Sequence, residues 1–296
     1  MTRGTRMKRI VGFSGGIDSQ ATALVVRRQF PADEIILLNS TAGGNEHPIT
    51  AGFIAEYSAD VFPVTVVEAT IRDLRELDEE NNTYSRKRDT YQPTDALTFD
   101  RLAEIIGRFP SRNAQFCTNY LKLAPSRRWC RDNLGDEDFE RYVGIRRDES
   151  PKRAKTPDSW WDEFFDCQVY APVAGWTKQQ CFDFVREAGE PVNPLYTMGF
   201  DKVGCAPCVN SGKDDIRMWA ARFPEMIDKV REWERRTGKT FFPPIMPDGK
   251  GGSRFGFVDE VVEWSRTTRG GKQYELPIVE AIAQRGECSS SYGLCE

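Results

Sequence analysis

The sequence predicts an α/β protein with a doubly wound parallel sheet and a C-terminal, cysteine-bearing helical extension. Two observations predict the sheet. Strand-like and helix-like segments alternate through the first half of the chain, and residues 34–39 form an apolar run without alternation, as in a strand buried on both faces. The extension is predicted because Gly, Pro and Cys become more frequent from Gly199 onward. We therefore expect a main domain over residues 1–198, with residues 199–296 packed on it.

The predicted elements follow from apolar periodicity and turn residues. Strands are expected at 8–14, 34–39, 61–67, 140–144 and 169–172. Helices are expected at 18–30 and 49–58, from about Thr177, whose hydroxyl can cap the first turn, and as one amphipathic helix over 214–236. The polar stretch 70–116 is expected to contain helices and a long loop.

Composition excludes several classes of protein. No apolar run approaches the roughly 20 residues that span a bilayer, and the basic start runs directly into a strand without a signal region. A soluble, cytoplasmic protein without membrane contact is therefore expected. The formal charge of -4 excludes a generally basic surface that coats nucleic acid, although local basic patches remain possible.

The segment SGGIDS joins the first predicted strand to the first predicted helix, a context in which backbone N–H groups bind phosphate. Gly15 and Gly16 let the backbone approach an anion, and Ser14 and Ser19 add hydroxyl donors. Asp18 can cap the helix or help to place Mg²⁺. No Lys follows the glycines, so this is not a Walker loop. A plain Gly-Gly turn is the alternative interpretation.

Eight cysteines without an export signal favour metal or redox chemistry over disulfides. Cys205 and Cys208 form a C-x-x-C on a Gly/Pro turn. Further candidate thiolate ligands are Cys117, Cys288 and Cys295, which gives five thiolates for at most four positions. Zinc and an iron–sulfur cluster both suit four thiolates, and a redox dithiol is a third possibility.

The other three cysteines and the single histidine limit these possibilities. Cys130, Cys167 and Cys181 have apolar or aromatic neighbours and are expected in the core. Because His47 is the only histidine, a zinc site with several imidazoles is impossible and a Ser-His-Asp triad is disfavoured.

With these motifs the chain resembles the phosphoadenosine phosphosulfate reductase family, within the adenine nucleotide α-hydrolases, also called N-type ATP pyrophosphatases or PP-loop proteins. The blocks that carry the resemblance are SGGIDS, NSTAGGNEHPIT, CTNYLKLAP, VGIRRDESPKR, PVAGWTKQQ, NPLYTMGFDKVGCAPC and YGLCE. The resemblance implies the α-hydrolase fold, an adenine nucleotide on the loop, and a four-iron four-sulfur cluster. Only Cys117 stands where the adenylylsulfate reductases have a cysteine pair, so the fourth ligand is expected to be Cys288 or Cys295.

The remaining candidate residues depend on which nucleotide is used. If ATP is the substrate, Lys122, Arg146 and Arg153 are expected to neutralise the departing pyrophosphate. If an activated sulfate such as phosphoadenosine phosphosulfate is the substrate, Cys295 is the candidate nucleophile, although the family tail E-C-G-L-H places its cysteine elsewhere. The loop after the second strand is expected to meet the adenosine through Asn39, Thr41 and Glu46.

Three functional classes remain open on the sequence. The chain also resembles the ATP pyrophosphatase of the DNA phosphorothioation systems, which implies activation of a nucleic-acid oxygen by ATP followed by sulfur insertion, and tRNA thiolation uses the same loop. Either reductase or sulfurtransferase chemistry implies a reductant or sulfur-donor protein as partner. A non-catalytic, nucleic-acid-associated protein with a structural zinc is the alternative outside catalysis.

Overall fold

The computed structural model describes residues 7–81, 89–111, 113–151 and 153–267. Its centre is a six-stranded sheet in the order β3-β2-β1-β4-β6-β5, accompanied by a small two-stranded sheet, β7-β8. The strands are β1 (Lys8–Gly12), β2 (Ile35–Ser40), β3 (Val64–Val67), β4 (Phe139–Tyr142), β5 (Ser159–Asp162), β6 (Cys167–Tyr170), β7 (Met246–Pro247) and β8 (Ser253–Arg254). All neighbours in the large sheet are parallel except β5 and β6.

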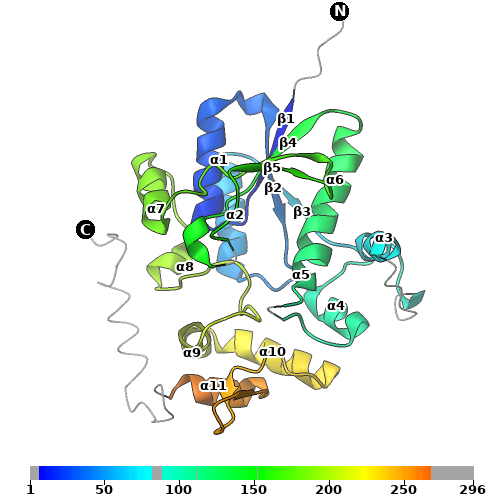
Figure 1. Ribbon diagram of the computed structural model, residues 1–296, viewed down its shortest axis with the longest axis vertical. Helices are drawn as coiled ribbons and strands as arrows, with labels where there is room; N and C mark the ends of the chain where they lie inside the picture. Colours follow the sequence, from blue (N-terminus) through cyan, green and yellow to red (C-terminus); the bar gives the residue numbers. More distant parts are fainter. Residues whose placement is uncertain (1–6, 82–88, 112, 152, 268–296) are drawn as a thin grey trace, which may run out of the picture.

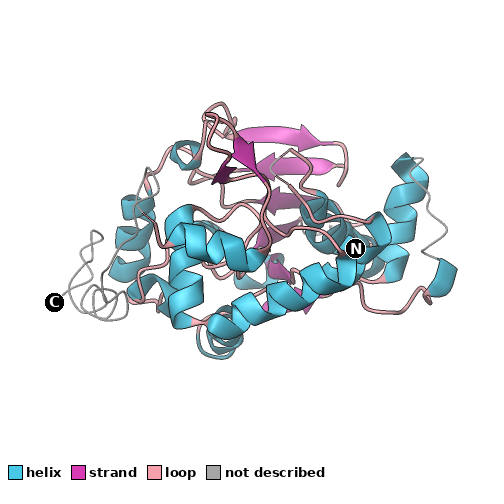
Figure 2. Ribbon diagram, turned by 90° about the horizontal axis from the view of Figure 1, so that it is seen from below, coloured by secondary structure: helices cyan, strands magenta, loops and turns pink. Residues whose placement is uncertain are grey.

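Helices cover both faces of this sheet and form the lower part of the molecule (Figures 1 and 2). They are α1 (Ile17–Gln29), α2 (Pro48–Asp60), α3 (Ile71–Asn81), α4 (Phe99–Ile106), α5 (Phe116–Thr118), α6 (Ala124–Leu134), α7 (Lys178–Glu187), α8 (Pro194–Thr197), α9 (Lys213–Arg222), α10 (Pro224–Thr237) and α11 (Val258–Ser265). Three short turns of helix complete the elements: η1 (Ala32–Glu34), η3 (Asn119–Leu123) and η4 (Arg147–Glu149). No helix in the described ranges is long and apolar enough to cross a membrane.

Adjacent residues of β1 face opposite sides of the sheet, which explains why the strand is apolar on both. Val11 packs in a cluster with Phe53 of α2, and Ile10 packs in another with Cys130 of α6. Both residues are at most 2% exposed. A parallel strand covered on two faces cannot alternate apolar and polar residues. The prediction of a doubly wound α/β fold is confirmed.

The direction of winding reverses between β1 and β4. From β1 the chain adds β2 and then β3 on one side, whereas β4 and β6 lie on the other side. In doubly wound sheets, a crevice opens at this switch point, outside the carboxyl ends of the two strands. The segments that follow β1 and β4 are therefore placed side by side by topology, although more than a hundred residues separate them in sequence.

The structure corrects one predicted element and adds a strand of the large sheet that was not predicted. The single helix expected over 214–236 is wrong: it is two helices, α9 and α10, which break at Phe223 and Pro224. Proline has no N–H and disfavours the α conformation of the preceding residue, and Phe223 has φ -138° and ψ 64°. The antiparallel edge strand β5 was not predicted from the sequence.

The C-terminal helices share a hydrophobic cluster with the main domain. Ile17 of α1, Val203, Trp219 of α9 and Val261 of α11 belong to one set of buried side chains. The boundary after residue 198 stays a prediction, since the apolar core is continuous across it. Cys130, Cys167 and Cys181 are at most 2% exposed, as expected for core residues.

Candidate nucleotide site

The loop between β1 and α1 lies at the switch point of the sheet. Helix α1 begins at Ile17, and its N-cap residue, Gly16, provides no side-chain hydrogen bond. Gly15 has φ +73°, a left-handed conformation that favours glycine. A Cβ on Gly15 would also lie 3.0 Å from Cγ1 of Ile54. The side chain of the N-cap residue therefore satisfies none of the first N–H groups of α1, and a helix N-terminus of this kind attracts anions.

Ser19 holds the shape of this loop. Its hydroxyl donates to the carbonyl of Gly16 at 2.8 Å and accepts from the N–H of Ser14 at 3.1 Å. The two serine hydroxyls lie 3.2 Å apart. Ser14 and Ser19, which were predicted as phosphate donors, therefore also brace the loop from within.

Residues far along the chain support the loop from outside. The N–H of Ile17 donates to the Tyr196 hydroxyl at 3.0 Å, and the Asn193 amide donates to the carbonyl of Gly15 at 3.2 Å. Gly144, which follows β4, lies directly against the loop, because a Cβ there would meet the Ser19 nitrogen at 2.6 Å. These three supporting residues were missed as site residues. Asn193 and Tyr196 lie in the block NPLYTMGF, so the signal was present but had no assigned role.

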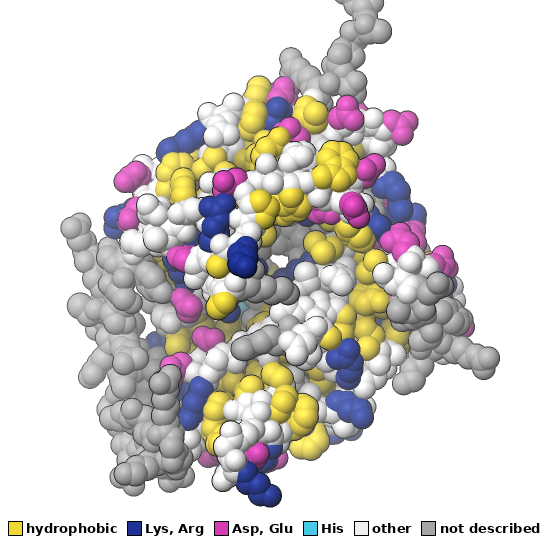
Figure 3. All heavy atoms as spheres, viewed as in Figure 1, with side chains coloured by type: hydrophobic (Ala, Val, Ile, Leu, Met, Phe, Trp, Pro, Cys, Tyr) yellow, Lys and Arg dark blue, Asp and Glu magenta, His cyan; other side chains and the backbone are white. Residues whose placement is uncertain are grey.

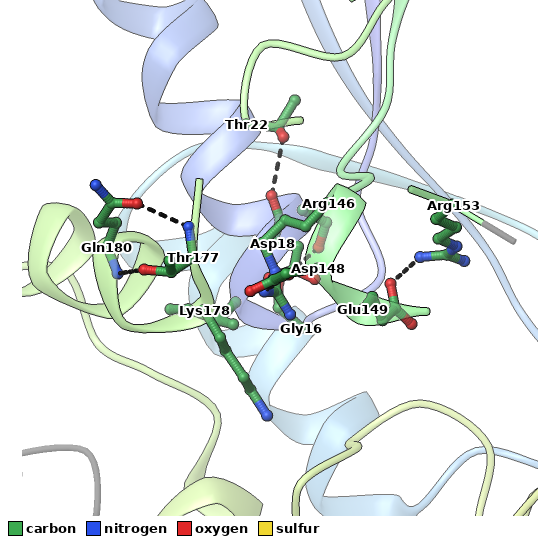
Figure 4. Close-up of polar contacts among 12 residues, drawn as sticks. Gly16, Asp18, Thr22, Arg146, Asp148, Glu149, Arg153, Thr177, Lys178 and Gln180 are labelled. Atoms are coloured by element: carbon green, nitrogen blue, oxygen red, sulfur yellow. Dashed lines mark hydrogen bonds and ion pairs between the residues drawn. The ribbon is translucent and has the colours of Figure 1, made fainter. Parts of the chain in front are cut away.

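Asp18, which follows β1, and Arg146, which follows β4, form an ion pair across the crevice. The guanidinium Nε donates to Asp18 Oδ1 at 2.7 Å, and a second nitrogen contacts Asp148 (Figure 4). Burial raises the pKa of Asp18, and Arg146 only partly opposes this effect. Burial by itself acts to lower the pKa of Arg146, but the two carboxylates outweigh it and raise that pKa. A cation that is 5% exposed is thereby fixed beside the phosphate loop.

Arg153 is placed differently from Arg146. It pairs with Glu149, and Figure 4 shows these two side chains facing one another to one side of Asp18. The Arg153 side chain is 41% exposed. The predicted role of Arg153 in nucleotide binding stays a prediction.

The loop after β2 connects the nucleotide crevice to the C-x-x-C turn. Glu46 forms a β-bridge with Cys205, and Ala206 N–H donates to the Asn45 carbonyl at 2.8 Å. Asn39 is used inside the sheet, where its amide donates to the Phe13 carbonyl at 2.7 Å. Thr41 N–H donates to the Val67 carbonyl at 3.0 Å. The expected contacts of Asn39, Thr41 and Glu46 with adenosine remain predictions.

Lys122 lies among the thiols. Its ammonium donates to Cys205 Sγ at 4.0 Å, and the negative charge of a Cys205 thiolate is the main cause that raises the pKa of Lys122, against the effect of burial. Burial raises the pKa of Cys117 to about 11, with Cys205 and Cys208 adding to the rise. The structure therefore brings three of the five candidate cysteines close enough to interact electrostatically.

Glu46 is a carboxylate between two lysines. Burial raises its pKa, while Lys122 and Lys229 act in the opposite direction. Lys229, on α10, also donates to the Gly44 carbonyl at 2.8 Å. The C-terminal extension thus contributes a cation beside the loop after β2, which the sequence did not predict. Figure 3 shows a hollow on this face, between the sheet and the lower helices.

The structure does not by itself define a metal centre. Over the described ranges, no group of three or more His, Cys, Asp or Glu side chains is arranged to hold a metal ion. Cys288 and Cys295, the remaining candidate ligands, lie outside the described residues. Thiols suit an iron–sulfur cluster by chemistry, but the three described ones would need a fourth ligand and closer convergence.

The geometry agrees with comparisons to known proteins. Residues 8–211 match the family model of the phosphoadenosine phosphosulfate reductase domain. The chain therefore belongs to this family of PP-loop, nucleotide-binding proteins.

Individual relatives extend this result. An uncharacterized 37.8 kDa protein of Escherichia phage 186 is 36% identical over 64% of this chain and 62% of its own length. Adenosine 5'-phosphosulfate reductase of Streptomyces coelicolor is 43% identical over 27% of this chain and 36% of its own length. The chain thus spans less than two thirds of these relatives. A phosphate complex of phosphoadenylyl-sulfate reductase from Candida auris aligns with a TM-score of 0.43 and 15% identity, covering 69% of this chain and 82% of that one.

Proposed function

We propose that this chain is an enzyme that holds the phosphate end of an adenine nucleotide, ATP or an activated sulfate, on the loop 14–19 and takes part in sulfur transfer or sulfur reduction. One observation carries the proposal: the start of α1, which has no side-chain cap, lies beside the buried cation of Arg146, which contacts Asp18 at the switch point of the sheet. Amides and a guanidinium together favour a polyanion at this place.

The chemical roles follow from these positions. With ATP, an acceptor oxygen attacks the α-phosphorus and pyrophosphate leaves, while the loop amides and Arg146 stabilise the charge that builds up on the leaving group. With an activated sulfate, a thiolate attacks sulfur and the nucleotide phosphate leaves from the same donors. Cys295 is the proposed nucleophile for the second route. Lys122 supplies positive charge near the thiols.

An iron–sulfur cluster on Cys205, Cys208 and Cys117, with Cys288 or Cys295 as fourth ligand, belongs to this proposal. The three described thiols all act on the pKa of Lys122, and thiolates are ligands that suit iron–sulfur clusters; both points support it. When bound, the cluster supplies one-electron redox chemistry or a structural clasp between the two parts of the chain. The lysine beside Cys205 would offset the negative charge of thiolate ligands.

The nucleotide part of the proposal is tested by calorimetry on anaerobically purified protein. We expect ATP or phosphoadenosine phosphosulfate to bind, and Ser19→Ala to weaken binding by about tenfold, since the Ser19 hydroxyl makes three hydrogen bonds within the loop and one such bond contributes about 1 kcal/mol. Ser253→Ala is the matched control, because Ser253 is exposed in β8. No binding of any adenylate to the intact protein would refute the proposal.

The reaction is assigned by its product. Incubation with ATP should release pyrophosphate if the chain is a pyrophosphatase or sulfurtransferase, and incubation with phosphoadenosine phosphosulfate plus a reductant should release sulfite if it is a reductase. Metal analysis of the purified protein tests the cluster. Iron together with acid-labile sulfide supports it, provided that Cys205→Ser loses both and Cys130→Ala keeps both. Stoichiometric zinc without sulfide would instead support the structural-zinc alternative.

A further inference from the structure

A cavity lies away from the phosphate loop. It has a volume of about 790 Å³ and is lined by residues that follow α4, by the turn after Cys208, and by segments 238–245 and 255–257. None of its lining residues belongs to the loop 14–19. A cavity of this size is typical of sites that bind a small molecule or one unit of a polymer.

Exposed aromatic rings stand at this cavity. Phe255 is 59% exposed and Phe257 is 49% exposed, whereas Phe241 and Phe242 behind them are buried. Exposed phenyl rings cost free energy in water and mark surfaces that contact a partner. Flat, accessible ring faces are suited to stacking on another planar group.

The charged side chains that line the cavity among the described residues are all positive. Arg108 and Lys239 line it and are exposed, and the described residues offer neither of them an ion-pair partner. Among the described residues no Asp or Glu lines the cavity, although acidic residues outnumber basic ones in the chain, 45 to 41. A ligand that carries negative charge next to a planar apolar group fits this combination of cations and rings.

The aromatic walls are held in place by one buried carboxylate. Glu234 is 3% exposed and accepts hydrogen bonds from the N–H groups of Phe241 and Val258, both at 2.7 Å. Phe241 belongs to one wall, and Val258 follows Phe257 of the other. Both wall segments are therefore fixed to helix α10, and such preorganisation reduces the entropy cost of binding.

The cavity adjoins the candidate thiols. The N–H of Cys208 donates to the Ser211 hydroxyl at 3.2 Å, and the N–H of Asn210 donates to Cys208 Sγ at 3.4 Å. Asn210 and Ser211 both line the cavity. The Oδ1 atom of Asn210 is buried and accepts no hydrogen bond within the described part of the chain. A bound group here would meet amide and hydroxyl partners directly beside the C-x-x-C.

We propose that this cavity binds a nucleotide unit, with its base stacked on Phe255 or Phe257 and its phosphate against Arg108 and Lys239. This binding role deepens the proposed function and rests on it for one point, namely that the molecule bound here is the acceptor in the proposed sulfur-transfer reaction. The unit can belong to single-stranded nucleic acid or to a free nucleotide. Base stacking on aromatic side chains and cations that follow phosphates are common to both sources.

The test uses the whole protein and fluorescence anisotropy with labelled oligothymidylate, and thymidine monophosphate as competitor. The double variant Phe255→Ala, Phe257→Ala should weaken oligothymidylate binding by about tenfold or more, in line with the loss of stacked bases. The double variant Arg108→Ala, Lys239→Ala should weaken it too and flatten its salt dependence. Trp161→Ala is the matched control, because Trp161 is a 57% exposed aromatic residue on β5.

The two sources are distinguished by the competitor. Much tighter binding of oligothymidylate than of the monophosphate indicates single-stranded nucleic acid, and equal binding per site indicates a free nucleotide. Failure of both probes to bind, or equal binding by the phenylalanine double variant and by Trp161→Ala, overturns the inference. In calorimetry these variants should keep the ATP binding assigned to the phosphate loop, which Ser19→Ala weakens, so a failure at this cavity is separable from a failure of the phosphate loop.

Discussion

Gly144 gives a sharp test of how the crevice is built. A Cβ at this position would lie 2.6 Å from the Ser19 nitrogen and 2.7 Å from the carbonyl carbon and oxygen of Asp18. All three are backbone atoms of the phosphate loop, which cannot rotate away as the end of a side chain can. Gly144 does not have a positive φ, so steric overlap and not backbone strain decides the outcome.

We therefore expect Gly144→Ala to displace the start of α1. Overpacking of this kind costs about 1–3 kcal/mol of folding free energy, and a misplacement of about 1 Å in a site can cost roughly 100-fold in function. Calorimetry with ATP should show a loss of affinity of about 10- to 100-fold, and thermal unfolding should show a lowered Tm.

The matched control is Gly52→Ala. Gly52 lies on the exposed side of α2, and nothing stands within 4 Å of the Cβ that alanine would add. Alanine is favoured over glycine inside a helix by roughly 0.5–1 kcal/mol, so this variant should be as stable as the wild type or more so. If Gly144→Ala binds nucleotide and unfolds as Gly52→Ala does, the close packing of the two loops is refuted.

Three further predictions follow from contacts in the same region. Arg146→Ala should lower the unfolding free energy by about 3 kcal/mol, because Asp18 is left without its buried partner, and should weaken nucleotide binding; an unchanged denaturation midpoint would contradict this. Tyr196→Phe keeps the ring but removes the hydroxyl that accepts from Ile17, so stability should fall by about 1 kcal/mol and ATP affinity several-fold, as measured by urea unfolding and calorimetry. Burial lowers the pKa of His47, the only histidine, so its single set of imidazole NMR signals should titrate below pH 6.5. As pH falls, the imidazole of the unfolded chain is protonated before that of the folded protein. The stability that neutral His47 contributes is therefore complete above the unfolded-state pKa and is lost as pH falls from that pKa to the lower folded-state pKa. An NMR titration midpoint at or above 6.5 would count against the buried position.

The position of His47 also shows why a lone histidine need not be catalytic. Its Nδ1 accepts from the N–H of Ile49 and caps α2, and its ring packs 4.3 Å from that of Phe223. Accepting a hydrogen bond requires an unprotonated Nδ1, and burial also favours the neutral imidazole. The sequence excluded a zinc site with several imidazoles. In the structure, the His47 side chain instead joins α2 to the C-terminal helices.

Local patterns in the sequence were sufficient for the parallel strands of the sheet and for the loop. Apolar runs bounded by Gly mark the buried strands, and the string SGGIDS is continuous, so short-range steric rules determine its turn and the start of α1. The break between α9 and α10 was also readable, because Pro224 disrupts any helix that would pass through it. The edge strand β5 was harder to predict, since four residues, SWWD, carry little periodicity.

Contacts between distant segments were decided only by tertiary structure. Asp18 meets Arg146 because the sheet reverses its winding between β1 and β4, and Glu46 meets Cys205 because the C-x-x-C turn packs back onto the loop after β2. No local rule encodes a pairing across more than a hundred residues. The sequence by itself determined which chemical groups are available, whereas burial of one continuous core determined which of them share a site.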